Sequence, residues 1–141
     1  MGFIAHHALV VTSSGYAEAH EALERAHAFA SSLTVDADWP GGTPLPVTPI
    51  LDGCVNDHRS FCILPDGSSE GWDTSREADA ARAKVVAFLE GMRYEDGSRP
   101  VTWVEVYFGG DLDSAEITVD SQSASGLGNG IDQGPASGVA P

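Results

Sequence analysis

Two stretches of helical periodicity, each flanked by segments typical of strands, constrain the fold of this chain most strongly. Apolar side chains recur every three or four positions in residues 15–33 and again in residues 74–93. Runs rich in Val, Ile, Leu and aromatic residues precede, separate and follow them, at residues 3–12, 49–55, 60–65 and 101–108. The order β-α-β-β-α-β predicts an α+β, ferredoxin-like antiparallel sheet with both helices on one face. In that arrangement the first and fourth strands are neighbours, and residues 115–119 add one extra C-terminal strand.

Turn and capping signals mark the ends of these elements. Residues 74–77 (TSRE) match the capping box, which predicts that the second helix begins at Thr74. Ser13, Ser14 and Gly15 are the cap candidates of the first helix. Residues 56–59 predict a hairpin turn, and residues 36–49, rich in Pro and Gly, predict an irregular loop.

Composition changes sharply after Asp120. The segment 121–141 is rich in Gly and Ser and has a single charged residue, Asp132. Such a segment buries too little apolar surface to offset the entropy lost on ordering. We therefore expect one folded domain over residues 1–120 and a flexible tail over residues 121–141.

Charge excludes several classes of function. The chain of 141 residues has 21 acidic and 7 basic side chains, a net charge of −14. General binding of nucleic acid or of anionic membranes needs the opposite balance. No apolar run is long enough for a membrane span, and the N-terminus lacks the cationic start of a signal peptide. Two cysteines, Cys54 and Cys62, fit a reducing compartment, so we expect a cytoplasmic protein.

Strand alternation assigns side chains to the two faces of the sheet. The purer apolar set, which we expect against the helices, comprises Leu9, Val11, Val104, Val106 and Phe108. The opposite, open face then receives His6, Val10, Trp103, Glu105 and Tyr107, together with Cys62 and Leu64 if Phe61 and Ile63 point inward. An open face of this composition indicates a stacking platform for a planar ligand, a dimer interface, or a surface covered by the loop that carries Trp39.

No catalytic motif is visible, and we expect neither an enzyme nor a bound metal or cofactor. The sequence lacks a G-x-S-x-G elbow, an H-E-x-x-H helix and a P-loop. Among the few basic residues, Arg59 and Arg76 are expected to flank one loop region and so to hold a phosphate. Surface ion pairs with the abundant carboxylates are the alternative role for both.

Five short segments stand out together: residues 6–13 (HHALVVTS), 59–61 (RSF), 65–72 (PDGSSEGW), 79–82 (DAAR) and 103–106 (WVEV). Through these segments the chain resembles small proteins encoded by tailed bacteriophages, over roughly residues 4–110. The resemblance implies a phage origin and brings no catalytic residues to this chain. Small acidic phage proteins without an enzyme motif are often accessory factors that blunt host immunity.

The sequence thus leads to a hypothesis and two alternatives. The hypothesis is a non-enzymatic anti-defence protein, acting as a homo-oligomer in the host cytoplasm, that sequesters a small nucleotide-like ligand. Its predicted ligand-binding residues are His6, Arg59, Arg76, Trp103, Glu105 and Tyr107. One alternative is an acidic inhibitor that binds a host defence protein directly. The other is a virion-associated structural protein that uses residues 121–141 as a tether.

Overall fold

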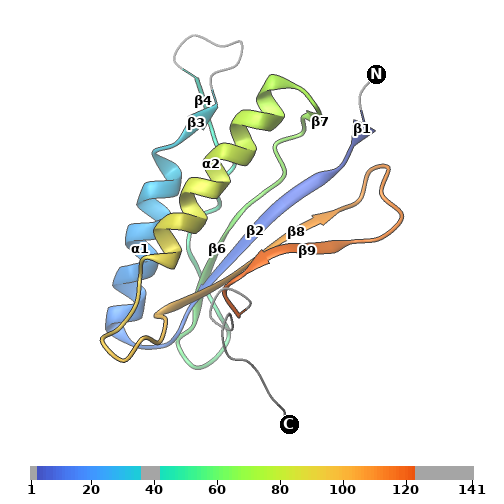
Figure 1. The fold of residues 1–141 in the computed structure, drawn as a ribbon. Coiled ribbons are helices and arrows are strands. Elements are labelled where there is room, and N and C mark those ends of the chain that lie inside the picture. The colour runs from blue at the N-terminus through green and yellow to red at the C-terminus, as the bar shows by residue number, and fades with distance from the viewer. Residues whose placement is uncertain (1–2, 36–41, 123–141) are drawn as a thin grey trace.

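The fold is a five-stranded antiparallel sheet with two helices on one face (Figure 1). The structure, a computed structural model, describes residues 3–35 and 42–122. Helices α1 (Ala17–Ser31) and α2 (Asp73–Glu90) lie side by side over the sheet, whose strand order is β5-β6-β2-β8-β9. The strands are β2 (His6–Ser13), β5 (Leu51–Asp52), β6 (Arg59–Ile63), β8 (Val101–Phe108) and β9 (Glu116–Asp120). The α+β class is confirmed, and the arrangement is compatible with a ferredoxin-like one.

Two short strand pairs complete the described structure. Strand β1 (Phe3–Ile4) pairs with β7 (Ser69–Glu70), and β3 (Thr34–Val35) pairs with β4 (Thr43–Pro44). Both pairs lie outside the main sheet, where they fix the chain on its way into β2 and α2 and out of α1. The predicted strand over residues 3–12 is in fact two strands, because the chain leaves the strand conformation at Ala5 between β1 and β2. The other three short strands were not predicted, since each has only two residues and therefore no period to detect.

The long strands match their predicted positions, whereas β5 is much shorter than expected. Strand β8 has the predicted bounds, and β9 pairs with it as predicted. Of the predicted strand at residues 49–55, only Leu51–Asp52 pairs with β6. The reason is that Thr48 takes up the next position along β6: its backbone N–H donates to Cys62 O at 2.8 Å, and its hydroxyl accepts from Cys62 N at 2.9 Å.

Neither helix has the predicted cap. Helix α1 follows Tyr16 at its N-cap position and α2 follows Trp72, and neither residue makes a side-chain capping bond. Ser13 is the last residue of β2, where it pairs with Arg59 and Val101, so it is unavailable to a helix. The capping box at Thr74 is wrong because the backbone N–H of Arg76 already bonds to Trp72 O, which starts the helix one residue earlier.

Small residues allow both helices to approach the sheet closely. Helix α1 buries Ala19, Ala22, Leu23, Ala26 and Ala30, and α2 buries Ala78, Ala81, Val85 and Leu89. These side chains form one core with Leu9, Val11, Phe61 and Ile63 of the sheet. Between the helices Phe29 stacks on Phe88 with ring centroids 4.7 Å apart. The predicted apolar stripes of both helices are therefore confirmed.

The predicted faces are correct for β2 and β6 and wrong for β8. Residues opposite one another on neighbouring strands share a face of the sheet. Val11 lies opposite Trp103 and Leu9 opposite Glu105, so Trp103, Glu105 and Tyr107 face the helices. The open face receives the other set from β8, namely Val104, Val106 and Phe108. Trp103, only 4% exposed, fills the core beside Val11, and Glu105 faces inward because a buried cation binds it there.

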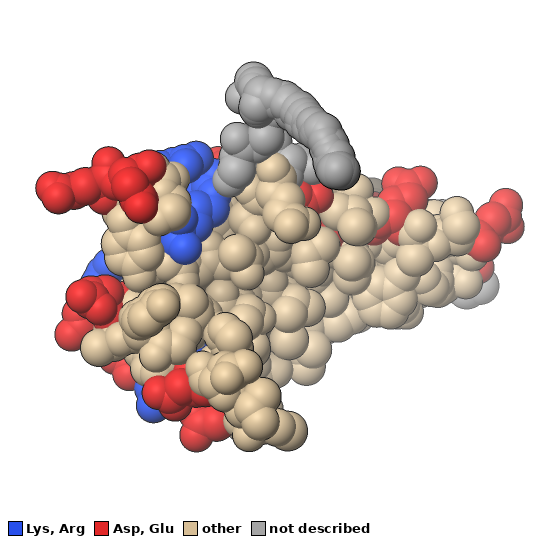
Figure 2. All heavy atoms as spheres, turned by 90° about the horizontal axis from the view of Figure 1, so that it is seen from below, with Lys and Arg blue, Asp and Glu red and all other residues tan. Residues whose placement is uncertain are grey.

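The open face is apolar and nearly free of charge. Strand register places a single acidic residue on it among the described ones, Asp120. Figure 2, a view from below, shows acidic side chains at both ends of the molecule and along its upper edge, with a broad uncharged surface below that edge. Residues 123–141 of the predicted tail lie outside the described part of the chain. Trp39, in the loop predicted as a possible cover of the open face, lies outside it too. Ser121, however, is buried, and its hydroxyl accepts a bond from the Trp103 backbone at 3.1 Å. No helix in the described residues is long and apolar enough to cross a bilayer.

Candidate functional site

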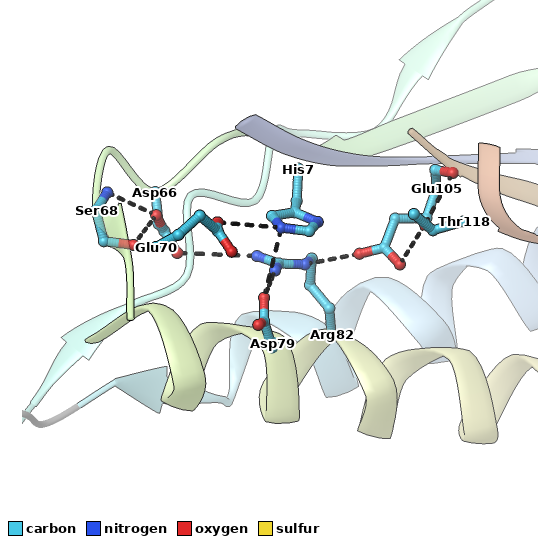
Figure 3. A network of polar contacts seen from close by, with 8 residues as sticks. All are labelled: His7, Asp66, Ser68, Glu70, Asp79, Arg82, Glu105 and Thr118. Carbon is cyan, nitrogen blue, oxygen red and sulfur yellow. Dashed lines mark hydrogen bonds and ion pairs between the residues drawn. The ribbon is translucent and has the colours of Figure 1, made fainter. Parts of the chain in front are cut away.

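A network of polar side chains connects α2 to the helix-facing side of the sheet (Figure 3). At its centre is Arg82 of α2, whose side chain is only 3% exposed. Its Nε donates to Glu105 Oε2 at 2.8 Å, and a terminal nitrogen donates to Asp79. The other terminal nitrogen lies 3.8 Å from Asp66 Oδ2. One guanidinium therefore contacts three carboxylates, which compensates for its removal from water.

Neighbouring groups hold two of these carboxylates in place. The hydroxyl of Thr118, on β9, donates to Glu105 and lies 3.0 Å from Oε1 and 3.2 Å from the backbone oxygen. Asp66 accepts bonds from the backbone and the hydroxyl of Ser68, at 2.8 and 2.7 Å. The network is therefore positioned from both sides before any ligand arrives, as a binding site requires.

His7 and Tyr107 extend the network toward β7. His7 Nε2 lies 3.4 Å from Glu70 Oε2 and 3.9 Å from Asp79 Oδ1, and the imidazole packs against the Tyr107 ring, with centroids 4.5 Å apart and planes tilted by 33°. Within the described residues this buried nitrogen has no hydrogen-bond partner of good geometry. Desolvation raises the pKa of Tyr107, and the carboxylates of Glu70, Glu116 and Asp79 raise it further. Tyr107 thus remains a neutral hydroxyl at physiological pH.

Beside the network, a cleft of about 310 Å³ lies between α2 and the strands β8 and β9. Its polar lining includes the carboxylates of Asp79, Glu90 and Glu105, and its apolar lining includes Val86 and Val119. None of the described lining residues is Lys or Arg. Arg82, the nearest buried cation, is already shared by three carboxylates. The cleft therefore has surplus negative charge above an apolar floor, which suits a cationic group on a hydrocarbon stem.

The predicted stacking platform does not exist, because its members lie on different faces. His6 is on the open face, where its ring lies 5.5 Å from that of Phe108. Trp103 is buried on the helix face, with the Arg99 guanidinium 4.7 Å from its ring centroid. Glu105 and Tyr107 also lie on that face and belong to the network around Arg82. Of the six predicted ligand-binding residues, only these two come together.

Arg59 and Arg76 do not flank one loop region. Arg59 begins β6 and Arg76 lies in the first turn of α2. In Figure 1 the start of β6 and the start of α2 lie at opposite ends of the molecule. Arg59 Nε lies 3.1 Å from an oxygen of Asp52, and Arg76 pairs with Asp73 and donates to Gly71 O at 2.7 Å. Both arginines therefore form ion pairs with surface carboxylates, the alternative role predicted from the sequence.

Sequence reasoning missed Arg82, and one signal was available. Ala78, Arg82, Val85 and Leu89 follow one another at helical spacing, so a cation interrupts the apolar stripe of α2. A charge at such a position is buried and needs a partner, which the carboxylate at Glu105 supplies. The contributions of Asp66 and Glu70 come from loop geometry that no period reveals.

A second, larger groove of about 610 Å³ lies between α1 and the C-terminal end of α2. Arg25 and Arg93 line it together with the aromatic rings of Phe88 and Tyr94. Glu18 and Glu21 line it too, so its charge is mixed. This groove thus combines cations with aromatic rings. Such a combination was predicted for the ligand site at Arg59, Arg76 and Trp103, which the structure does not bring together.

Comparisons with known proteins add no assignment. No family model matches the chain, no curated protein matches it, and no solved structure matches it. Among the described residues, no group of three or more His, Cys, Asp and Glu is arranged to hold a metal ion. Any functional proposal therefore rests on the geometry of this chain.

Proposed function

We propose that this protein is a non-enzymatic binding protein whose acidic cleft between α2 and β8–β9 receives a basic segment of another protein. The observation that carries this proposal is the surplus of carboxylates at the cleft: Asp79 and Glu105 share the single guanidinium of Arg82 with Asp66. Glu90 adds a further carboxylate to the lining, and no described lining residue is Lys or Arg. A guanidinium or ammonium donates to such carboxylates in charge-assisted hydrogen bonds. Its aliphatic stem covers the apolar surface formed by Val86 and Val119.

The charge of the whole chain favours the same partner. A net charge of −14 attracts a basic surface over the range of the Debye length and speeds its encounter. Rigid preorganisation by Thr118 and Ser68 lowers the entropy lost on binding. Both properties suit an inhibitor that covers a basic, nucleic-acid-binding site on its target.

We propose the kind of target from the phage origin that the sequence resemblance implies. We infer an anti-defence protein in the cytoplasm of an infected bacterium, with a host defence protein as its partner. For the fold we propose the finer assignment of a ferredoxin-like domain with β9 as its extra strand. The alternative of a virion-associated protein depends on residues outside the described part of the chain, and mass spectrometry of purified particles tests it.

Calorimetric titration with an Arg-rich peptide tests the cleft. We compare the double variant Asp79→Asn/Glu90→Gln, in the cleft, with Glu95→Gln/Asp113→Asn, which removes the same charge elsewhere. The cleft variant should weaken binding about tenfold, or about 1.4 kcal/mol, while the control changes it little. If the two variants weaken peptide binding equally, binding depends only on the net charge of the protein, which contradicts the proposal. Thermal unfolding of both variants verifies that they are folded.

A small nucleotide-like ligand remains a second candidate, favoured by the groove between Arg25 and Arg93. Arginine and aromatic rings are the groups that hold phosphate and a base, and Phe88 and Tyr94 supply the rings. Thermal unfolding with a panel of nucleotides, cyclic dinucleotides and ADP-ribose derivatives tests it. A ligand at about 100 times its Kd adds about 2.7 kcal/mol of stability. Arg25→Gln/Arg93→Gln should abolish that gain, and a panel without any stabilising ligand would contradict this candidate.

A further inference from the structure

We propose that the open face of the sheet is a homodimer interface, occupied by the same face of a second copy of this chain. The face displays an apolar surface across four strands, made of Ala8, Val10, Cys62, Val104, Val106, Phe108 and Ile117. Val10 lies at its centre, with Cys62 opposite on one side and Val104 opposite on the other. Val10 is 37% exposed and Ile117 63% exposed, although both are large apolar side chains. An uncovered sheet face of this kind is typical of an interaction surface.

Charge selects a second copy as the occupant. Each copy has a net charge of −14, so two copies repel one another wherever their carboxylates meet. Among the described residues that strand register places on this face, Asp120 is the only acidic one, at the end of β9. This is therefore the surface through which copies associate with the least repulsion. A basic partner, in contrast, gains no ion pairs here and is drawn to the acidic cleft on the helix side.

The size and shape of the face fit a symmetric dimer. The five strands have 28 residues, so a strand spacing of about 4.8 Å and a rise of about 3.3 Å per residue give the face a flat area of roughly 440 Å². Two copies then cover roughly 900 Å², slightly less than the roughly 1,000 Å² of a stable specific interface, so we expect a weak dimer that dissociates on dilution. A hollow of about 320 Å³ between β2, β8 and β9 receives a side chain of the second copy; its lining combines the apolar Val10, Val104 and Ile117 with polar residues that include Thr12, Thr102 and Asp120. A two-fold axis brings identical faces together, as most homodimers require.

The mass in solution, measured by light scattering from low micromolar to high concentration, tests the proposal. The wild-type chain should have twice its 14.7 kDa mass at high concentration. Val10→Lys places a charge at the centre of the face and should give a monomer. Val55→Lys, at a position 70% exposed in the turn before β6, is the matched control and should remain a dimer. A monomeric wild type at every concentration, or an unchanged dimer in Val10→Lys, would overturn the proposal.

Cys62 provides a second measurement that needs no charged substitution. In a Cys54→Ser background, alkylation of Cys62 should be slow at high protein concentration and faster on dilution, because the second copy covers this thiol. A rate independent of concentration would overturn the dimer. A second result would also overturn it: a monomeric protein in which Cys62 is alkylated readily only after residues 123–141 are deleted. That result would mean that the chain's own C-terminal segment, and not a second copy, covers the face. Val10→Lys should still bind the Arg-rich peptide, which separates this proposal from that of the cleft.

Discussion

At the scale of single residues, Arg82 determines both the stability of the domain and the charge of its cleft. Its guanidinium is almost fully buried and contacts Glu105, Asp79 and Asp66. Removing one partner of a buried ion pair leaves the others desolvated and unpaired. Arg82 is therefore a structural counter-ion that allows carboxylates to face the interior, while their surplus remains available to a ligand.

Substitution of Arg82 should be among the most destabilising changes in the chain. We expect Arg82→Ala to lower the free energy of unfolding by about 3–5 kcal/mol, since up to three carboxylates lose their cation. Urea denaturation measures this loss. Arg76→Ala is the control: Arg76 pairs with Asp73 on the surface, so its loss should cost less than about 1 kcal/mol. Similar values for the two variants would contradict the structural role of Arg82.

Tyr107 should titrate above its ordinary pKa of about 10. Desolvation, together with Glu70, Glu116 and Asp79, disfavours its phenolate. Because the folded-state pKa lies above the unfolded one, the contribution to stability is full below pH 10 and is lost as pH rises through the folded-state pKa. The ultraviolet titration curve of Tyr107→Phe, subtracted from that of the wild type, gives the titration of the Tyr107 phenol alone. Glu116→Gln should lower the pKa, whereas Glu95→Gln should not; a Tyr107 pKa at or below 10 would refute the arrangement.

At the scale of elements, strand β8 shows where sequence reasoning succeeds and where it stops. Its existence and bounds follow from dense Val and aromatic residues. Alternation separates its side chains into two sets but does not say which set faces the helices. Apolarity pointed to Val104 and Val106, whereas Trp103 and Glu105 face inward. The deciding factor is Arg82, which lies 23 residues away in sequence and has to meet a carboxylate.

The turn between β8 and β9 depends on glycine. Gly110 has a φ of +57°, and a Cβ there would lie 1.9 Å from the backbone oxygen of Ile4. Gly110→Ala should therefore lower the free energy of unfolding by at least about 2 kcal/mol and disturb the contact with β1. Gly97 has a φ of +88° and nothing within 4 Å, so Gly97→Ala should cost only about 1 kcal/mol. Denaturation curves compare the two, and an equal cost would contradict the close approach at Gly110.

At the scale of the whole molecule, the helix side of the sheet has a buried charge network, whereas among the described residues the other side has only Asp120 as an acidic residue. The α+β class, the two helices and the long strands follow from hydrophobic periodicity, whereas the two-residue strands do not. The network does not, because Asp66, Glu70, Arg82 and Glu105 come from separate elements that only the tertiary fold brings together. The structure separates an acidic cleft from an apolar face, so one molecule has room for a basic partner and for a second copy.

The proposed binding of a basic segment in the cleft between α2 and the strands β8 and β9 can be located residue by residue. NMR titration of the ¹⁵N-labelled protein with the Arg-rich peptide at physiological salt measures it. Binding in the cleft should change the amide shifts most at Ala83, Val86 and Val119, which line the cleft, and little at Glu95 or Asp113. Changes spread evenly over the acidic surface, or confined to residues outside the cleft, would contradict it.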